Sequence, residues 1–155
     1  SLLYVTKHAP LRAVDIAILE EPPHARSEIE AKASGDTNPI HLDEEYAKTT
    51  EFGGRIAHGM LSGAIISAAM AQSLPGPGSI YLSQNMKFKA PVRIGDTLTV
   101  SIELTEKKNR RAMIALRVIV TNQDGVKVVV GDTTAIAPTE KLIVAPAELP
   151  SIKIG

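Results

Sequence analysis

The chain of 155 residues contains no cysteine and no tryptophan, and only two phenylalanines and three tyrosines. Without cysteine it has no disulfide framework, no thiolate nucleophile and no zinc knuckle, which fits a reducing compartment, and we expect a cytoplasmic protein. Because aromatic residues are so few, the core must be built from Leu, Ile, Val and Ala. Because hydrophobic residues still reach 44% of the chain, its length and composition predict one folded domain rather than disorder.

The sequence also lacks an excess of charge and a long apolar run. Seventeen basic residues balance seventeen acidic ones without a basic block, which disfavours nucleic acid as a partner. The segment Ser1–Pro10 has none of the features of a signal peptide. The uncharged segment Ile56–Met86 is interrupted by Gly59, Gly63 and Pro75, so it falls short of the roughly 20 strongly apolar residues of a membrane span. We expect a buried helix there and no membrane contact.

Two helices are expected in the first third of the chain. Ser27–Glu30 has the pattern of a capping box, which predicts a helix start, and Gly35 is a natural helix stop. This helix would deliver the chain directly to Asp36. A second short helix is expected to begin at Asp43 and to run to about Lys48.

A third, longer helix is expected from Gly59 to about Ser73, small and aliphatic nearly all round and therefore enclosed. Alternating apolar residues predict an early strand and four later ones, each with one strongly buried face. The apolar sets are Val14, Ile16 and Ile18; Ile80, Leu82, Met86 and Phe88; Leu98, Val100, Ile102 and Leu104; Ile114, Leu116, Val118 and Val120; Val126, Val128, Val130 and Ile136. Hairpin turns are expected at Lys107–Arg111 and Asn122–Gly125, and a bulge or close backbone contact at Gly131. The fold class is α+β, an antiparallel β-sheet wrapped around one long buried α-helix.

Asp36 and His41 are the residues most suited to chemistry. They lie five residues apart across a turn at Asn38-Pro39, so their side chains can converge on one small volume. A carboxylate and an imidazole that share one water can move protons at neutral pH. The residue types alone leave a structural alternative open, in which Asp36 caps a helix end and His41 is a hydrogen-bonded loop histidine.

Several short blocks in a fixed order carry a family resemblance. They are Ser34–Asp36, Asn38–His41, Asp43, Ala57–Met60, Gly78–Gln84 and Phe88–Asp96. On these blocks, and above all on the Gly-Asp-x-Asn-Pro-x-His motif, the chain resembles the MaoC-like (R)-specific enoyl-CoA hydratases, which have the hot-dog fold. The resemblance divides the chain into an N-terminal extension (1–12), a MaoC-like hot-dog domain (13–138) and a C-terminal tail (139–155).

The resemblance implies roles for four residues of the site. Asp36 and His41 would be the catalytic pair, Asn38 would orient the site, and the Gly59 amide would bind the thioester oxygen. The chemistry agrees, because hydration of an enoyl thioester builds negative charge on that oxygen, and a helix N-terminus offers N–H donors and partial positive charge. A tight loop-to-helix junction is a second reason for glycine at this position.

The pocket for the acyl chain is expected along the face of the long helix that follows Gly59. Helical spacing brings in Ser62, Gly63, Ile66, Ser67 and Met70, and the resemblance also places Ser67 and Met70 beside the acyl tail. For Met70, plain packing against the sheet is an equal alternative. The basic residues Lys87, Lys89 and Arg93 can hold CoA phosphates or can be solvated charges at strand ends.

His58 and the question of a metal complete the site. A histidine just before a helix start is expected to point away from the groove and to be structural. Asp36, His41, Asp43 and His58 are conceivable metal ligands by type, but no His-x-x-x-His spacing exists and the chemistry needs no metal. We therefore expect no metal and no cofactor.

The resemblance implies a hydro-lyase of fatty acid metabolism that hydrates trans-2-enoyl-CoA to (R)-3-hydroxyacyl-CoA, reversibly, and the Asp36–His41 pair suits this chemistry. Its partner would be an acyl-CoA substrate. The alternatives are a 3-hydroxyacyl-ACP dehydratase, a hot-dog acyl-CoA thioesterase and a non-catalytic acyl-CoA binding module. Because a sheet wrapped around one helix leaves unpaired edges, a two-fold homodimer joined edge to edge is expected, as the resemblance also implies.

Overall fold

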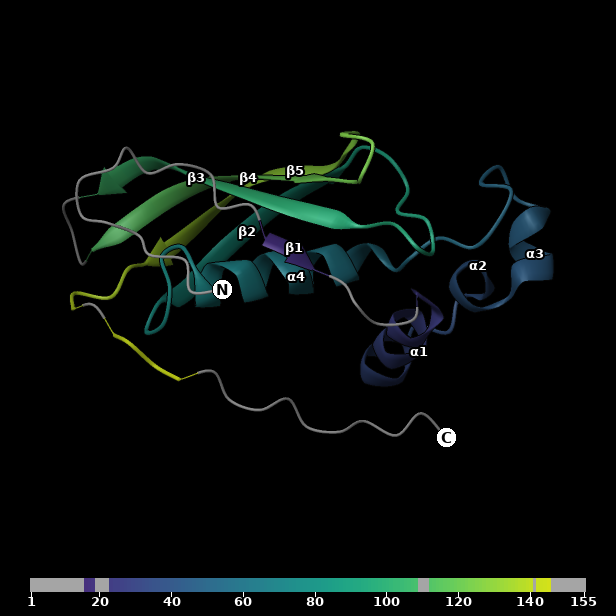
Figure 1. The fold of residues 1–155 in the computed structure, drawn as a ribbon, viewed down its shortest axis with the longest axis horizontal. Helices are drawn as coiled ribbons and strands as arrows, with labels where there is room; N and C mark the ends of the chain where they lie inside the picture. The colour runs from purple at the N-terminus through teal and green to yellow at the C-terminus, as the bar shows by residue number, and fades with distance from the viewer. Residues whose placement is uncertain (1–15, 19–22, 109–111, 141, 146–155) are drawn as a thin grey trace.

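The computed structural model describes residues 16–18, 23–108, 112–140 and 142–145. In chain order its elements are β1 (Ile16–Ile18), α1 (Pro23–Ser34), α2 (Pro39–Leu42), α3 (Glu44–Lys48), α4 (Gly59–Gln72), β2 (Ile80–Phe88), β3 (Leu98–Lys108), β4 (Met113–Thr121) and β5 (Lys127–Ile136). The strands form one antiparallel sheet in the order β1-β3-β4-β5-β2. Figure 1 shows this sheet curving over α4, with α1, α2 and α3 grouped beyond the amino end of α4. The α+β fold with one long helix against an antiparallel sheet is thus confirmed.

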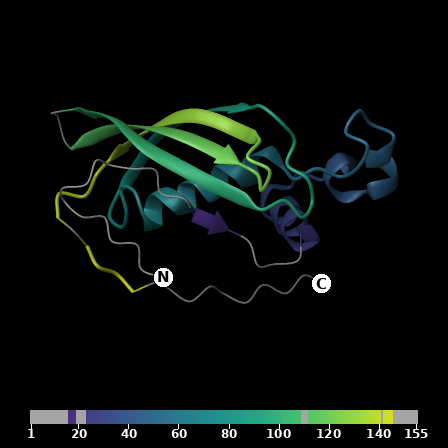
Figure 2. The ribbon, with the colours of Figure 1, turned by 45° about the horizontal axis from the view of Figure 1, so that its top comes forward.

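The long helix α4 packs one side against the sheet. Ile65, Ile66, Ala69 and Met70 are buried in a cluster with side chains of β3, β4 and β5. The opposite side remains exposed along the stripe Met60, Ala64, Ser67 and Ala71, and Met60 keeps 60% of its surface accessible. The expectation that the helix is enclosed all round is therefore wrong for the single chain, because the sheet covers only one side (Figure 2). No helix among the described residues is long and apolar enough to cross a membrane.

The two central strands follow their apolar alternation. In β3, Leu98, Val100 and Ile102 are buried and Leu104 is half-buried. In β4 all four expected residues are buried, namely Ile114, Leu116, Val118 and Val120. The buried side chains of both strands form one cluster with those of α4, and the period-two prediction is confirmed.

The alternation predicted for β5 is wrong beyond its first residues. Val120 pairs with Val129 and Thr121 pairs with Lys127, so Val128 is an extra residue in this strand. A bulge of one residue moves every later side chain to the other face. Val128 is buried as predicted, but Val129, Thr133 and Ala135 are buried instead of Val130 and Ile136, which are half-buried, and Val126 before the strand is exposed.

The edge strand β2 also departs from prediction. Ile80, Leu82 and Phe88 are exposed, and only Met86 of the predicted set is half-buried. Leu82 is an extra residue relative to β5, which moves Ile80 to the face opposite Met86 and Phe88, and β2 pairs with nothing described on its other side. The close contact expected at Gly131 is confirmed, because a Cβ at this residue would lie 1.9 Å from the Asn85 carbonyl oxygen of β2.

The helices before the site are partly as expected. Helix α1 begins at Pro23, four residues early, so Ser27 lies inside the helix and the predicted capping box is wrong. Proline is favoured in a first turn, where it forfeits no helical hydrogen bond. The predicted end is confirmed, since Gly35 has a φ of +79° and its N–H donates to Ala31 O at 2.9 Å. The short helix capped by Asp43 is confirmed as α3.

The expected turns and boundaries are only partly within the described residues. The Asn122–Gly125 turn is confirmed by a hydrogen bond from Gly125 N–H to Asn122 O at 3.0 Å and by a φ of +75° at Gly125. The centre of the Lys107–Arg111 turn, Val14 and most of the tail lie outside the described residues. The domain boundaries at 13 and 138 stay a prediction.

Candidate active site

The turn that carries Asp36 is built from hydrogen bonds between close neighbours. Beyond Gly35, the Asp36 N–H donates to Ser34 Oγ at 3.1 Å. The Asp36 carboxylate accepts from the Asn38 N–H, also at 3.1 Å. Because Asp36 is exposed, its carboxylate remains accessible to water and to a ligand.

Asn38 starts the short helix α2, where sequence reasoning expected only a turn. Its side-chain oxygen accepts from the Ile40 N–H at 3.2 Å, and Pro39 occupies the first helical position. The His41 N–H donates to the Asn38 carbonyl at 3.0 Å. Asn38 therefore sets the orientation of the helical turn that carries His41, which is a physical basis for the orienting role expected of it.

The His41 ring is held through one nitrogen. It is 9% exposed, and Nδ1 lies 2.9 Å from the Ile56 carbonyl oxygen. A carbonyl only accepts, so Nδ1 carries the hydrogen and Nε2 of the neutral ring keeps its lone pair for another partner. The strand-like segment around Ile56 is itself fixed, because Ile56 N–H donates to Ile40 O at 3.3 Å and Ala57 N–H to Val92 O at 2.8 Å.

Asp36 and His41 do converge, together with His58. One potential ligand atom from each of the three side chains lies within 4.8 Å of the other two. His58 is 3% exposed and places Nε2 3.0 Å from the Asp36 carbonyl oxygen. Its ring lies against that of His41, with 4.0 Å between centroids and 31° between planes. The expectation that His58 points away from the site is therefore wrong.

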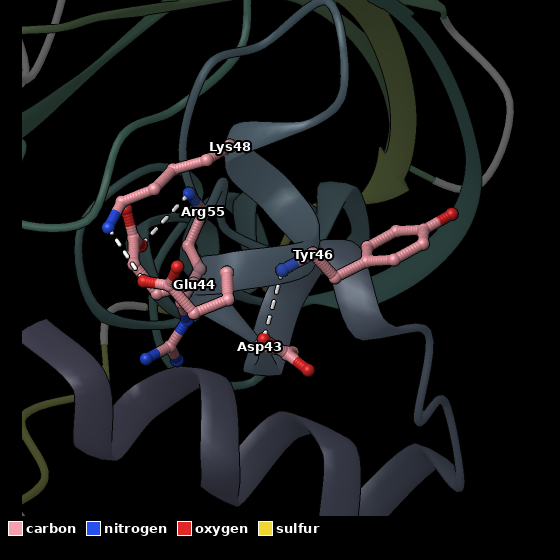
Figure 3. A network of polar contacts seen from close by, with 6 residues as sticks. Asp43, Glu44, Tyr46, Lys48 and Arg55 are labelled. Atoms are coloured by element: carbon pink, nitrogen blue, oxygen red, sulfur yellow. Dashed lines mark hydrogen bonds and ion pairs between the residues drawn. The ribbon is translucent and has the colours of Figure 1, made fainter.

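Arg55 supports the same histidine from the other side and was missed by sequence reasoning. Its Nε donates to the His41 carbonyl at 2.8 Å, and its N–H donates to Glu44 Oε2 at 3.3 Å. Figure 3 shows Arg55 and Glu44 side by side at the start of α3, near the Asp43 cap of Tyr46. Ile56 was missed as well. Both residues act on or through main-chain atoms, for which a sequence offers no residue-type signal.

Gly59 begins α4, directly after His58. The His58 side chain makes no capping hydrogen bond to this helix, so no side chain of the N-cap covers the first N–H groups of α4. A Cβ at Gly59 would lie 3.1 Å from Phe88 Cε1. A side chain here would be tight against β2 unless the exposed Phe88 ring shifted by a few tenths of an ångström, and glycine also leaves room for an approaching ligand.

The residues expected along the acyl pocket occupy different environments. Ser62 is buried and Gly63 is half-buried, and a Cβ at Gly63 would meet the methyl carbons of Met86 and Met60 at 3.2 and 3.4 Å. Ser67 is exposed on the open side of α4. Met70 is buried in the core cluster, where its packing role is evident. A role for these residues in an acyl pocket stays a prediction, which rests on helical spacing and, for Ser67 and Met70, on the family resemblance as well.

The three basic residues also differ from one another. Lys87 and Lys89 are exposed. Arg93 is exposed too, but its guanidinium donates to the Phe52 carbonyl and its N–H donates to Asp96 Oδ2 at 2.7 Å. Arg93 therefore ties the segment after β2 to the loop after α3, which is a structural role available without any phosphate.

A metal site by ligand type exists at Asp36, His41 and His58. The sequence spacing gave no hint of it, because the tertiary fold brings His58 across from a segment 22 residues away. One carboxylate and two imidazoles are a common donor set for Zn²⁺. The same three groups serve equally well as an acid–base pair with a supporting imidazole, so the donor set alone does not require a metal.

Comparisons with known proteins agree on one family. The profile of the MaoC-like domain matches residues 7–126. An (R)-specific enoyl-CoA hydratase of Rhodospirillum rubrum is 48% identical over 108 residues, which are 70% of this chain and 74% of that protein. A 3-hydroxybutyryl-CoA dehydratase of Methylorubrum extorquens is 51% identical over 87 residues, 55% of each chain. The unliganded R-hydratase PhaJ1 of Pseudomonas aeruginosa superposes with a TM-score of 0.83 at 48% identity, covering 92% of this chain and 89% of that one.

Proposed function

The chain belongs to the MaoC-like dehydratase family, and from that premise we propose that it is a hydro-lyase which adds water to trans-2-enoyl-CoA and forms (R)-3-hydroxyacyl-CoA. The reaction is reversible, since a catalyst accelerates both directions. One observation carries the proposal. A carboxylate from the turn before α2 and an imidazole from α2, Asp36 and His41, converge with His58, the N-cap of α4, and an acid–base pair next to a helix amino end is what hydration of an enoyl thioester needs.

The proposed chemistry uses one water held between Asp36 and His41. Its hydroxyl adds to C3 of the enoyl group, its remaining proton passes to the pair, and a proton from the pair is delivered to C2 on the same face. A carboxylate and an imidazole can each give or take a proton, so the acid and base roles are assigned to the pair. Addition is syn and the product is the (R) alcohol.

The thioester oxygen is proposed to lie at the amino end of α4. As C3 is attacked, negative charge moves onto this oxygen, and the Gly59 N–H with the partial positive charge of the helix terminus stabilises it. His58 precedes Gly59 and hydrogen-bonds the Asp36 main chain, which supports a short distance between the pair and this helix end. No cofactor enters this scheme.

The test of this function is a crotonyl-CoA assay followed at the enoyl-thioester absorbance band. This short substrate is a natural first choice because a relative is named 3-hydroxybutyryl-CoA dehydratase. A hydratase bleaches the band, a thioesterase releases free thiol, and a binding module does neither. An (S) product in chiral analysis would contradict the proposed geometry, and the same assay with an enoyl-ACP distinguishes the two carriers.

A homodimer joined along β2 is also proposed. Large apolar side chains on this edge strand and on the nearby helix start are exposed in the single chain, namely Met60, Ile80, Tyr81, Leu82 and Phe88. An exposed apolar sheet edge is normally covered by a partner. Light scattering at micromolar concentration should give twice the chain's 16.5 kDa, and a mass of one chain would refute the dimer. The location in the cytoplasm stays a prediction.

A further inference from the structure

His58 is a buried residue between the turn that carries Asp36 and the amino end of α4. It is the N-cap of α4, yet its side chain makes no capping hydrogen bond to that helix. Among the described residues its Nδ1 has no hydrogen-bond partner, although the side chain is only 3% exposed. An unpartnered polar atom in a buried place costs free energy, so packing and capping are poor reasons for histidine here.

The other nitrogen of His58 holds the turn that carries Asp36. Nε2 lies 3.0 Å from the Asp36 carbonyl oxygen, so it carries the hydrogen and donates. All other hydrogen bonds described for residues 35–38 join positions at most four apart in the sequence. Among the hydrogen bonds described for residues 35–38, the one from His58 is thus the one that joins the turn to a residue far away in the sequence, 22 positions from Asp36.

The His58 ring also restricts His41. The hydrogen bond from His41 Nδ1 to Ile56 O fixes one ring atom, but the ring can still rotate about that bond. The His58 ring lies 4.0 Å away at 31°, which limits this rotation and hence the direction of Nε2. One side chain thus contacts both members of the pair, and the residue after it is Gly59.

We propose that His58 is a positioning residue which fixes Asp36 and His41 relative to the amino end of α4, chiefly through the hydrogen bond from Nε2 to the Asp36 carbonyl. This inference rests on the proposed hydration. It assigns no proton transfer to His58 and no contact with substrate. Misplacing a catalytic group by about 1 Å can cost about two orders of magnitude, so a tether of this kind has a measurable effect on rate.

The test compares the parent, two variants of His58 and one control variant, each in the whole 155-residue chain. His58→Ala removes the tether, whereas His58→Gln keeps an amide donor at nearly the place of Nε2. Val118→Ala, in the buried centre of β4, is the control for lost stability at a residue that has no contact with Asp36, His41 or His58 among those described. Each protein is assayed with crotonyl-CoA well below its melting temperature, and amide hydrogen exchange is followed in the peptide that spans residues 35–41.

For His58→Ala we expect kcat to fall about 10- to 100-fold with KM within about threefold of the parent, because positioning and not binding is lost. Exchange in residues 35–41 should rise. In His58→Gln both readouts should return to within about threefold of the parent, and Val118→Ala should leave both unchanged. The proposal is overturned if His58→Ala keeps the parent's exchange rates in residues 35–41, or if His58→Gln is as impaired as His58→Ala. Exchange decides the matter even if the parent does not hydrate crotonyl-CoA, an outcome that would instead refute the proposed function.

Discussion

The two halves of the site have opposite physical character. The Asp36–His41 segment lies largely at the surface and is shaped by short-range hydrogen bonds, with only a few contacts to the rest of the chain. Helix α4 is anchored by apolar side chains that are buried under the sheet. The difference shows where each task can be done, because proton transfer needs groups that water can reach, whereas stabilisation of charge needs a donor held in a fixed place by a packed helix.

The largest expected effect comes from substitutions in the Asp36–His41 segment. We predict that Asp36→Asn and His41→Ala each lower kcat by about 10²- to 10⁴-fold, since each removes a general acid–base group. Asp36 is exposed, and loss of the buried His41 ring removes its one described side-chain hydrogen bond, to Ile56 O, so the fold should survive both changes and circular dichroism should stay that of the parent. Near-parent activity in either folded variant would remove the pair from the mechanism.

The proposed role of the amino end of α4 is tested by removing the Gly59 N–H. Gly59→Pro should lower kcat by about 10²- to 10³-fold, because one donor to the developing oxyanion is lost while proline is compatible with a first helical turn.

Gly59→Ala is the matched control for Gly59→Pro. It keeps the N–H and adds the Cβ that would lie 3.1 Å from the Phe88 ring. If both variants lose the same activity, crowding of Phe88 and not the missing donor explains the loss.

A smaller effect is expected deeper along α4, at Met70. Met70→Ala should lower the free energy of unfolding by about 2 to 5 kcal/mol, because the side chain is buried in the core cluster. If this residue also ends the acyl pocket, kcat/KM should shift toward longer enoyl chains, by up to about fourfold for each methylene newly buried. A panel of enoyl-CoA lengths measures the shift. An unchanged profile in the folded variant would place the pocket's end elsewhere.

The smallest effect is expected from metal removal. Asp36, His41 and His58 form a set of possible ligands, but the proposed reaction uses only proton transfer and the helix terminus. Dialysis against EDTA should leave kcat with crotonyl-CoA unchanged within the error of the assay. A loss of activity that added Zn²⁺ restores would show that Asp36, His41 and His58 work as a metal site instead.

The sequence correctly predicted the elements whose signals lie within a few residues and whose strand register is regular. The alternation in β3 and β4 is right because no register shift interrupts either strand within the predicted apolar residues, Leu98–Leu104 and Ile114–Val120. The end of α1 at Gly35 and the cap at Asp43 are right because glycine with positive φ and an acceptor at an N-cap act within a few residues.

The failures occur where another part of the chain decides. The bulge at Val128 reverses the faces of β5, and nothing in its run of valines marks which residue is extra. The apolar pattern of β2 predicts burial, but an edge strand is buried only by something outside the single chain.

For the site, the sequence by itself determined the spacing of Asp36 and His41 and the turn chemistry at Asn38 that lets them converge, because these interactions span fewer than six residues. Only the tertiary structure decided which nitrogen of His41 is tied to Ile56, that Arg55 bonds the His41 carbonyl, and that His58 lies under the pair. These contacts join segments 14 to 22 residues apart through main-chain oxygens. Every residue carries such an oxygen, so side-chain identity does not reveal which one a folded chain will use.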